Sequence, residues 1–107
     1  MATTIVKPAI ETTERDQSTS QYHVVLLDDD DHTYDYVIEM LQALLVFSKA
    51  QAFRHAEEVD TVGRTILLTC DKPAAEFARD QVRGYGRDHR LPRSTGSMVA
   101  IVELAYC

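Results

Sequence analysis

The sequence predicts an α+β fold, a two-layer sandwich in which three strands pack against three helices. Two observations lead to this prediction. Apolar runs of strand length occur at 22–27, 65–70 and 98–104. Segments with apolar residues at helical spacing lie between them, which gives the order strand, helix, helix, strand, helix, strand. The length of 107 residues is usual for one domain.

The first strand is the run Tyr22–Leu27, whose valines and leucines favour extended structure. Asp28–Asp31 end it, because aspartate disfavours strands and four adjacent like charges repel one another. Thr33 or Asp31 can then cap a helix by accepting a hydrogen bond from a backbone N–H. The apolar face of this helix comprises Val37, Met40, Leu41 and Leu44.

A second helix is expected after Ser48, because Ser48 and Gln51 have the spacing of a capping box. Gly63 provides a turn into the second strand, Thr65–Cys70. The face of this helix that we expect to be buried comprises Ala52, Ala56 and Val59.

A third helix is expected after Asp71, which is a favourable N-cap, and Pro73 is tolerated in its first turn. Gly86 is its expected C-cap, and a polar loop over 87–96 leads to the strand 98–104. The expected inner face comprises Phe77, Ala78, Gln81, Val82 and Tyr85.

Residues 1–21 differ in composition from the rest of the chain. They are rich in Thr, Ser, Glu and Gln, so they can bury little apolar surface. We therefore expect a flexible N-terminal tail over 1–21 and one core domain over 22–107.

Charge and composition argue against several classes of protein. A formal net charge of −6 disfavours binding to nucleic acid, which depends on clustered Lys and Arg. Cys70 and Cys107 make no disulfide framework, which favours a reducing compartment. No apolar stretch reaches the roughly 18 residues of a membrane span, and polar residues interrupt any signal-peptide core. We expect a cytoplasmic protein without membrane or nucleic-acid partners.

The segment 22–41, YHVVLLDDDDHTYDYVIEML, resembles the opening of the ClpS core. That family typically has an aromatic residue, a Val/Leu strand, an Asn-Asp-Asp loop and then a helix that begins near Thr-Pro-Met. Further matches are Ala52, Val59, Gly63-Arg64 and Tyr85. The resemblance covers residues 22–104 without large insertions. It implies the ClpS core, a three-stranded antiparallel sheet packed against three helices.

The resemblance also implies an adaptor rather than an enzyme. ClpS proteins bind substrates through a bulky N-terminal residue, a degradation signal known as an N-degron. They deliver these substrates to a Clp AAA+ unfoldase of the ClpA or ClpC type, which their N-terminal tail and core surface engage. The chain shows no substrate clamp or phosphate loop, so we expect no catalytic activity and no cofactor.

The resemblance places a binding site for a peptide N-terminus. In the family, an Asn and an Asp of the acidic loop and a His of the second helix hold the free α-ammonium group, and these positions match Asp28, Asp30 and Asp60. We expect Asp29, in the same loop, to contribute to this N-terminus site as well. An ammonium group needs acceptors, preferably charged, and the side chain beside it needs an apolar cavity. The cavity positions match His32, Tyr34, Val37, Ala56, Val59 and Met98.

Several of these positions depart from the family, which predicts a changed ligand preference. Asp28 replaces the Asn and Asp60 replaces the His, so carboxylates would gather at one site and favour a bound cation. Ala56 replaces a Met and widens the cavity, whereas Tyr34 replaces another Met and can refill it. We expect relaxed or shifted selectivity for the first side chain.

The alternative function is that of a protein-interaction module, which has the same fold but no longer binds N-degrons. Its docking surface could be formed by Arg79, Arg83 and Arg87, which recur every four residues. The other interpretation of these three arginines is a solvated basic face.

Metal binding is the remaining alternative. Some acidic positions after the first strand fit a calcium-loop template, but Thr33 replaces the glycine that the template requires. The four histidines lack the spacing of zinc ligands. We expect no metal site.

Overall fold

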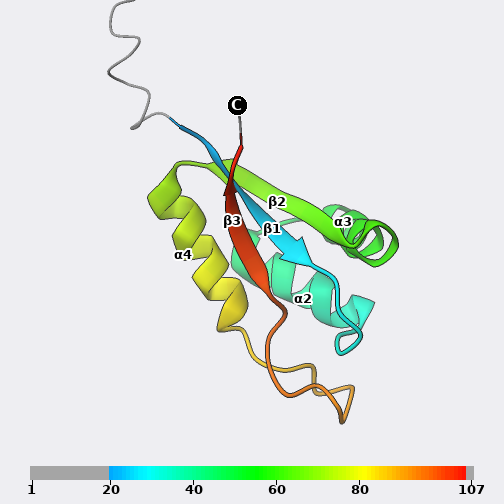
Figure 1. The fold of residues 1–107 in the computed structure, drawn as a ribbon. Coiled ribbons are helices and arrows are strands. Elements are labelled where there is room, and N and C mark those ends of the chain that lie inside the picture. Colours follow the sequence, from blue (N-terminus) through cyan, green and yellow to red (C-terminus); the bar gives the residue numbers. More distant parts are fainter. Residues whose placement is uncertain (1–19, 106–107) are drawn as a thin grey trace, which may run out of the picture.

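The computed structural model describes residues 20–105, and Figure 1 shows their fold. The elements follow the predicted order. They are β1 (Tyr22–Leu27), α2 (Tyr34–Leu45), α3 (Lys49–Val62), β2 (Arg64–Cys70), α4 (Lys72–Arg83) and β3 (Ala100–Leu104). Within this part of the chain, no helix is long and apolar enough to cross a membrane.

β1 is the central strand of a three-stranded antiparallel sheet. The strand order is β2-β1-β3, and β1 pairs antiparallel with both neighbours. In Figure 1, α2 crosses behind the sheet, with α4 and α3 on either side of it. The predicted α+β sandwich is confirmed. Because β1 is central, the acidic segment after Leu27 emerges beside the start of both β2 and β3.

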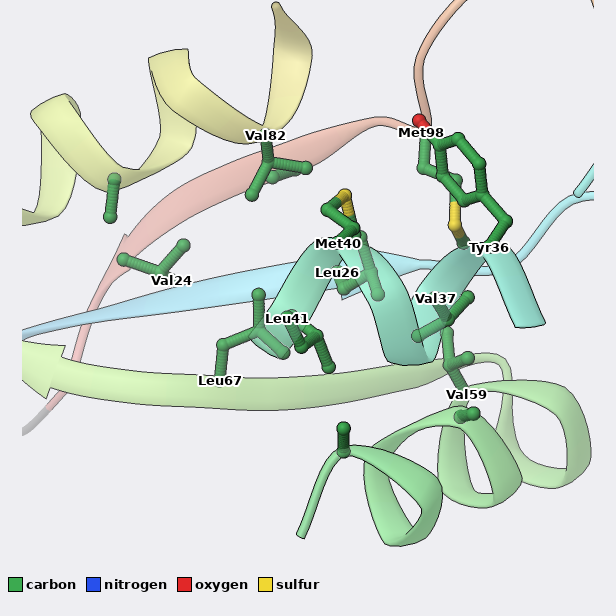
Figure 2. Close-up of a cluster of buried hydrophobic side chains, with 14 of the residues drawn as sticks. Val24, Leu26, Tyr36, Val37, Met40, Leu41, Val59, Leu67, Val82 and Met98 are labelled. Atoms are coloured by element: carbon green, nitrogen blue, oxygen red, sulfur yellow. The ribbon is translucent and has the colours of Figure 1, made fainter. Parts of the chain in front are cut away.

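The hydrophobic core lies between the sheet and the helices (Figure 2). Val24 and Leu26 of β1 are fully buried, and they share one cluster with Met40 and Leu41 of α2 and Val82 of α4. Burial of each such side chain contributes about 1.5–3 kcal/mol. The alternation of side chains along β1 therefore sets the face of the sheet on which the helices pack.

The opposite face of the sheet carries an ion pair between its two edge strands. Val25 points to this face and is nevertheless 0% exposed. The register places Arg64 beside Leu27 and places Glu103 beside His23. The Arg64–Glu103 ion pair therefore runs diagonally above Val25.

A side chain caps the N-terminus of each of the three helices. For α3 and α4 the capping residue is the single one that the sequence predicted. Ser48 and Gln51 form both hydrogen bonds of the capping box, at 3.1 and 2.9 Å. Asp71 caps α4 through its carboxylate. For α2, where two candidates were open, the cap is Thr33 rather than Asp31, and its hydroxyl accepts a hydrogen bond from the first turn.

α4 differs from the prediction at its end and on its inner face. The helix has Gly84 as its C-cap, so the prediction that Gly86 caps it is wrong. Phe77 is 65% exposed rather than buried. It lies one residue, about 100° of rotation, from Ala78, which is buried. The buried positions of α4 are Ala75, Ala78 and Val82.

The segment around the last strand also differs from the prediction. Tyr85 lies beyond the end of α4 and is 37% exposed, so it does not belong to the inner face of that helix. β3 begins at Ala100 rather than at Met98. Met98 is nevertheless buried, because Val99 O accepts a hydrogen bond from Leu27 N–H at 3.0 Å and holds this segment against the end of β1.

The polar loop between α4 and β3 is ordered around a buried carboxylate that no sequence pattern indicated. Asp88 Oδ2 accepts hydrogen bonds from Thr33 N–H at 2.7 Å and from the Thr33 hydroxyl at 2.8 Å. Its Oδ1 accepts from the backbone and side chain of Arg90 at 3.0 and 3.2 Å. Burial alone would raise the pKa of Asp88, but these hydrogen bonds lower it to about 2.

The substitution Asp88→Asn is expected to destabilise the protein in a pH-dependent way. The folded-state pKa lies below the unfolded value of about 3.9, so the carboxylate contributes stability above about pH 4 that is lost toward pH 2. Denaturant unfolding at pH 7 should show a loss of about 1–3 kcal/mol in the variant. The gap to the wild type should close between about pH 4 and pH 2.

Asp35→Asn is the matched control, because the Asp35 side chain is 76% exposed and lies 4.0 Å from Arg90. It should change the free energy of unfolding by less than about 0.5 kcal/mol. A gap between wild type and Asp88→Asn that stays constant down to pH 2 would show that the charge of Asp88 is not what stabilises the loop.

Val46 is held in the left-handed region, and its replacement by glycine is expected to stabilise the protein. It is the C-cap of α2 with φ of 58° and ψ of 33°, and it is 86% exposed. A β-branched residue is strained there by about 1–2 kcal/mol, whereas glycine is the usual residue at such a cap. Val46→Gly should raise the melting temperature by a few degrees.

Val62→Gly provides the contrast, because Val62 is also exposed but ends a regular helix, α3. Glycine weakens a helix, so this variant should melt at a lower temperature than the wild type. A loss of stability in both variants would contradict strain at Val46.

Candidate functional site

A small cavity of about 40 Å³ lies where the end of β1, the start of α2 and the end of α3 meet. All six expected hydrophobic-pocket positions line it, together with three of the four expected aspartates and Thr33. The lining residues are Asp28, Asp29, His32, Thr33, Tyr34, Val37, Ala56, Val59, Asp60 and Met98. Thr33 was not expected in this group, although its place directly before Tyr34 could have indicated it.

Backbone hydrogen bonds bring these segments together. Asp28 N–H donates to Gly63 O at 3.0 Å, so the end of β1 meets the C-cap of α3. Gly63 has φ of 101°, a conformation that favours glycine, and this sharp turn places Asp60 beside Asp28. Met98 reaches the cavity because the next residue, Val99, accepts a hydrogen bond from Leu27 N–H.

Asp28 and Asp60 form the negatively charged wall of the cavity. Burial raises the pKa of Asp28, and the neighbouring charges of Asp60, Asp29 and Asp30 raise it further, against the lowering effect of the hydrogen bond from Asp29 N–H. Asp60 lies in the last turn of α3, where the helix dipole is negative. A cation bound between the two carboxylates would relieve this repulsion.

Asp29 already has a hydrogen-bond partner within the protein. His32 Nδ1 lies 2.8 and 3.0 Å from the two carboxylate oxygens of Asp29, and its Nε2 lies 2.7 Å from Gly96 O. The His32 ring thus connects the acidic loop to the segment before β3. The side chain of His32 is 4% exposed. It therefore forms a polar, structural wall rather than an apolar one.

Asp30 does not line the cavity, so the structure places it apart from Asp28 and Asp60, and its role in an ammonium site stays a prediction. Its backbone carbonyl accepts a hydrogen bond from Arg93 Nε at 3.0 Å, and Arg93 also pairs with Asp31 at 3.2 Å. The chain turns away from the cavity at this point because Asp29 accepts a hydrogen bond from the Asp31 N–H.

Tyr34 lies at the mouth of the cavity. Its hydroxyl donates to Asp60 Oδ2 at 2.9 Å, and this hydrogen bond raises the pKa of Tyr34. Its ring lies 5.8 Å from that of Phe53, centroid to centroid. Phe53 was not among the expected site residues. Its position on an otherwise polar face of α3, one turn before Ala56 and Glu57, was a usable signal.

The floor of the cavity is apolar and tightly packed. Val37, Ala56, Val59 and Met98 are each no more than 4% exposed. Figure 2 shows Val37 on α2 and Val59 on α3 side by side, with Met98 next to Tyr36. These walls belong to the hydrophobic core, so they cannot move without disturbing it.

Arg79, Arg83 and Arg87 make different contacts and do not form a uniform basic stripe. Arg79 Nε pairs with Asp80 at 3.0 Å, and Arg83 Nε donates to Ala100 O at 2.9 Å. Arg87 donates to three backbone carbonyls of the loop that follows it. Arg87 thus has a structural role, and a docking role for the three arginines stays a prediction.

A wider concavity of about 730 Å³ lies on the other side of α3. Its walls are mostly polar or charged, and Phe47 and Leu67 are its large apolar side chains. We assign the site to the smaller cavity, because carboxylates and a buried apolar floor converge there. The residues that line the wider concavity are Phe47, Gln51, Arg54, His55, Glu57, Glu58, Thr61 and Leu67.

The site has the groups of a binding pocket. Its carboxylates can accept hydrogen bonds from a cation, and its floor can accept an apolar group next to that cation. The Thr33 hydroxyl donates to Asp88 and accepts from Tyr36 N–H, so both of its hydrogen bonds serve the start of α2. Within residues 20–105, no group of three or more His, Cys, Asp or Glu side chains is placed to hold a metal ion.

Comparison with known proteins gives a consistent set of relatives. Residues 17–94 match the family model for the ATP-dependent Clp protease adaptor protein ClpS. The adaptor ClpS of Synechococcus sp. is 33% identical over 88 residues, which is 81% of this chain and 94% of that protein. The adaptor ClpS of Synechococcus elongatus is 34% identical over 84 residues, or 78% of this chain and 86% of that protein.

A solved structure has the same fold. It is that of ClpS2 from Agrobacterium tumefaciens bound to L-phenylalaninamide, with a TM-score of 0.69 and 21% identity over 80% of this chain and 98% of that one. At this identity the likeness supports the fold alone, whereas the family model and the Synechococcus relatives span most of the sequence. On these grounds, the chain belongs to the ClpS family of Clp protease adaptors.

Proposed function

We propose that this protein binds peptides by their free N-terminal amine and first side chain, and delivers them to a Clp AAA+ unfoldase. The observation that carries the proposal is the convergence of Asp28 and Asp60 on one cavity with a buried apolar floor. The α-ammonium group would bind to these two carboxylates. The first side chain would enter between Val37, Val59 and Met98.

The remaining parts of the proposal rest on the family. An unfoldase of the ClpA or ClpC type would be the partner, and the cytoplasm would be the location. The N-terminal tail predicted over 1–21 would engage the unfoldase. Residues 1–19 lie outside the described part of the chain, and Gln21 is held at the sheet, because its carbonyl accepts a hydrogen bond from Ala105 N–H at 2.8 Å.

One observation favours the alternative, a protein-interaction module without N-degron binding. The cavity of about 40 Å³ is small for a bulky side chain, and the Tyr34 hydroxyl already occupies one oxygen of Asp60. Peptide titrations separate the two functions.

We expect peptides with a free N-terminal amine to bind, and we expect the same peptides not to bind after N-acetylation. Calorimetric titration with peptides that begin with Ala, Val, Ile, Leu, Phe, Tyr or Trp tests this, each paired with its acetylated form. Acetylation removes the positive charge and two of the three donors, so the loss should exceed about tenfold. Equal affinity of the two forms would remove N-terminus recognition and favour the interaction module.

Substitution of the two cavity carboxylates is expected to weaken free-amine peptides selectively. Asp60→Asn removes a charge at hydrogen-bonding distance from the proposed ammonium group, so affinity should fall about ten- to hundredfold. Asp28→Asn keeps an amide acceptor, the group that the family has at this position, so its loss should be smaller, about two- to tenfold. Asp30→Asn is the matched control, because it removes the same charge from the same loop at a position that does not line the cavity. Equal losses in all three variants would indicate a general charge effect instead of a site.

A further inference from the structure

Tyr34 differs from the apolar walls of the cavity because its side chain is partly exposed. Tyr34 is the first residue of α2 and is 36% exposed, although it lines the cavity. Two contacts hold its ring in place. These are the hydrogen bond from its hydroxyl to Asp60 at 2.9 Å and the ring contact with Phe53, itself 45% exposed.

The volume of the cavity limits what can enter while this ring is in place. About 40 Å³ accommodates a few water molecules at most, because a cavity needs roughly 10–15 Å³ to hold one. The methyl group of an N-terminal alanine is of that size, whereas the four carbons of leucine or the seven of phenylalanine are not. Because the other apolar walls belong to the core, a larger side chain requires the Tyr34 ring to rotate outward.

Rotation of the ring and binding of the amine involve the same carboxylate. The phenol donates to Asp60 Oδ2, and Asp60 is one of the two carboxylates proposed to hold the ammonium group. An ammonium group is a stronger donor to a carboxylate than a neutral phenol is. An arriving peptide would therefore compete with Tyr34 for Asp60 and loosen the ring at the same time.

We propose that Tyr34 is a gate that determines which first side chains the site accepts, with its hydrogen bond to Asp60 as the latch. Peptides with a small first residue bind with the ring in place, and peptides with a bulky first residue bind only after the ring has swung out. This inference rests on the proposed recognition of peptide N-termini. It adds the hydrogen bond that couples binding of the amine to movement of this wall.

Two substitutions separate the latch from the wall. Tyr34→Phe keeps the ring and removes the competing hydroxyl, so all free-amine peptides should gain about two- to tenfold in affinity, whatever their first residue. Tyr34→Ala also removes the wall. Peptides that begin with Phe or Leu should then gain at least about tenfold, because their side chains become buried. A peptide that begins with Ala should gain no more than it does in Tyr34→Phe.

Tyr85 provides matched controls. It is 37% exposed, almost the same as Tyr34, and its ring contacts that of Tyr36 away from the cavity. Tyr85→Phe and Tyr85→Ala should leave all peptide affinities unchanged. Thermal melting of each variant, measured beside the titrations, shows whether a change in affinity follows from a loss of folded protein.

A second measurement observes the gate directly. In protein with isotope-labelled tyrosine rings, the NMR signal that is missing from Tyr34→Phe belongs to Tyr34. It should shift strongly on addition of a peptide that begins with Phe, and the Tyr85 signal should not.

The outcomes distinguish failure of the gate from failure of the proposed function. If free amines are preferred over acetylated ones but the Tyr34 variants behave like the Tyr85 variants, the gate is wrong and the function stands. If Tyr34→Ala improves the Ala and Phe peptides equally, the ring does not read side-chain size, and the gate is again wrong. If even Tyr34→Ala does not distinguish free from acetylated peptides, both proposals are wrong.

Discussion

The buried carboxylate of Asp88 is the constraint on which the rest of the site depends. It accepts two hydrogen bonds from Thr33, the residue that caps α2, and two from Arg90. The loop between α4 and β3 is thereby fixed to the start of α2. That loop carries Met98 and that helix begins with Tyr34, so one interaction sets the relative position of the floor and the mouth of the cavity. An unpaired buried carboxylate would be costly, which explains why it has this many donors.

The four aspartates of the acidic site differ in function because their partners differ. Asp29 is hydrogen-bonded to His32, and Asp30 lies outside the cavity beside Arg93. Asp28 and Asp60 retain acceptor capacity, and their mutual repulsion is part of what raises the pKa of Asp28. The site therefore combines one internal hydrogen-bonded pair, which is structural, with two carboxylates that favour a cation from outside. Tyr34 partly satisfies Asp60 until such a cation arrives.

Elements whose signals are local followed from the sequence, and elements that depend on packing did not. The capping box of Ser48 and the N-cap at Asp71 involve residues a few positions apart, so the sequence alone contains both partners. By contrast, Phe77 is exposed although it is apolar, and Gly84 rather than Gly86 caps α4. Only one face of α4 packs against the rest of the protein. Which residues lie at the edge of that face depends on the packing, and the sequence does not determine it.

The sequence by itself determined the fold class, the strand and helix order, the membership of the ClpS family and most of the positions that surround the cavity. Only the tertiary structure decided which carboxylates remain available, that the Tyr34 hydroxyl donates to Asp60, and that Asp88 holds the loop. The physical reason is distance along the chain. Tyr34 and Asp60 are 26 residues apart, and Thr33 and Asp88 are 55 residues apart. Hydrogen bonds of this kind depend on ångström-scale geometry that only the folded chain establishes.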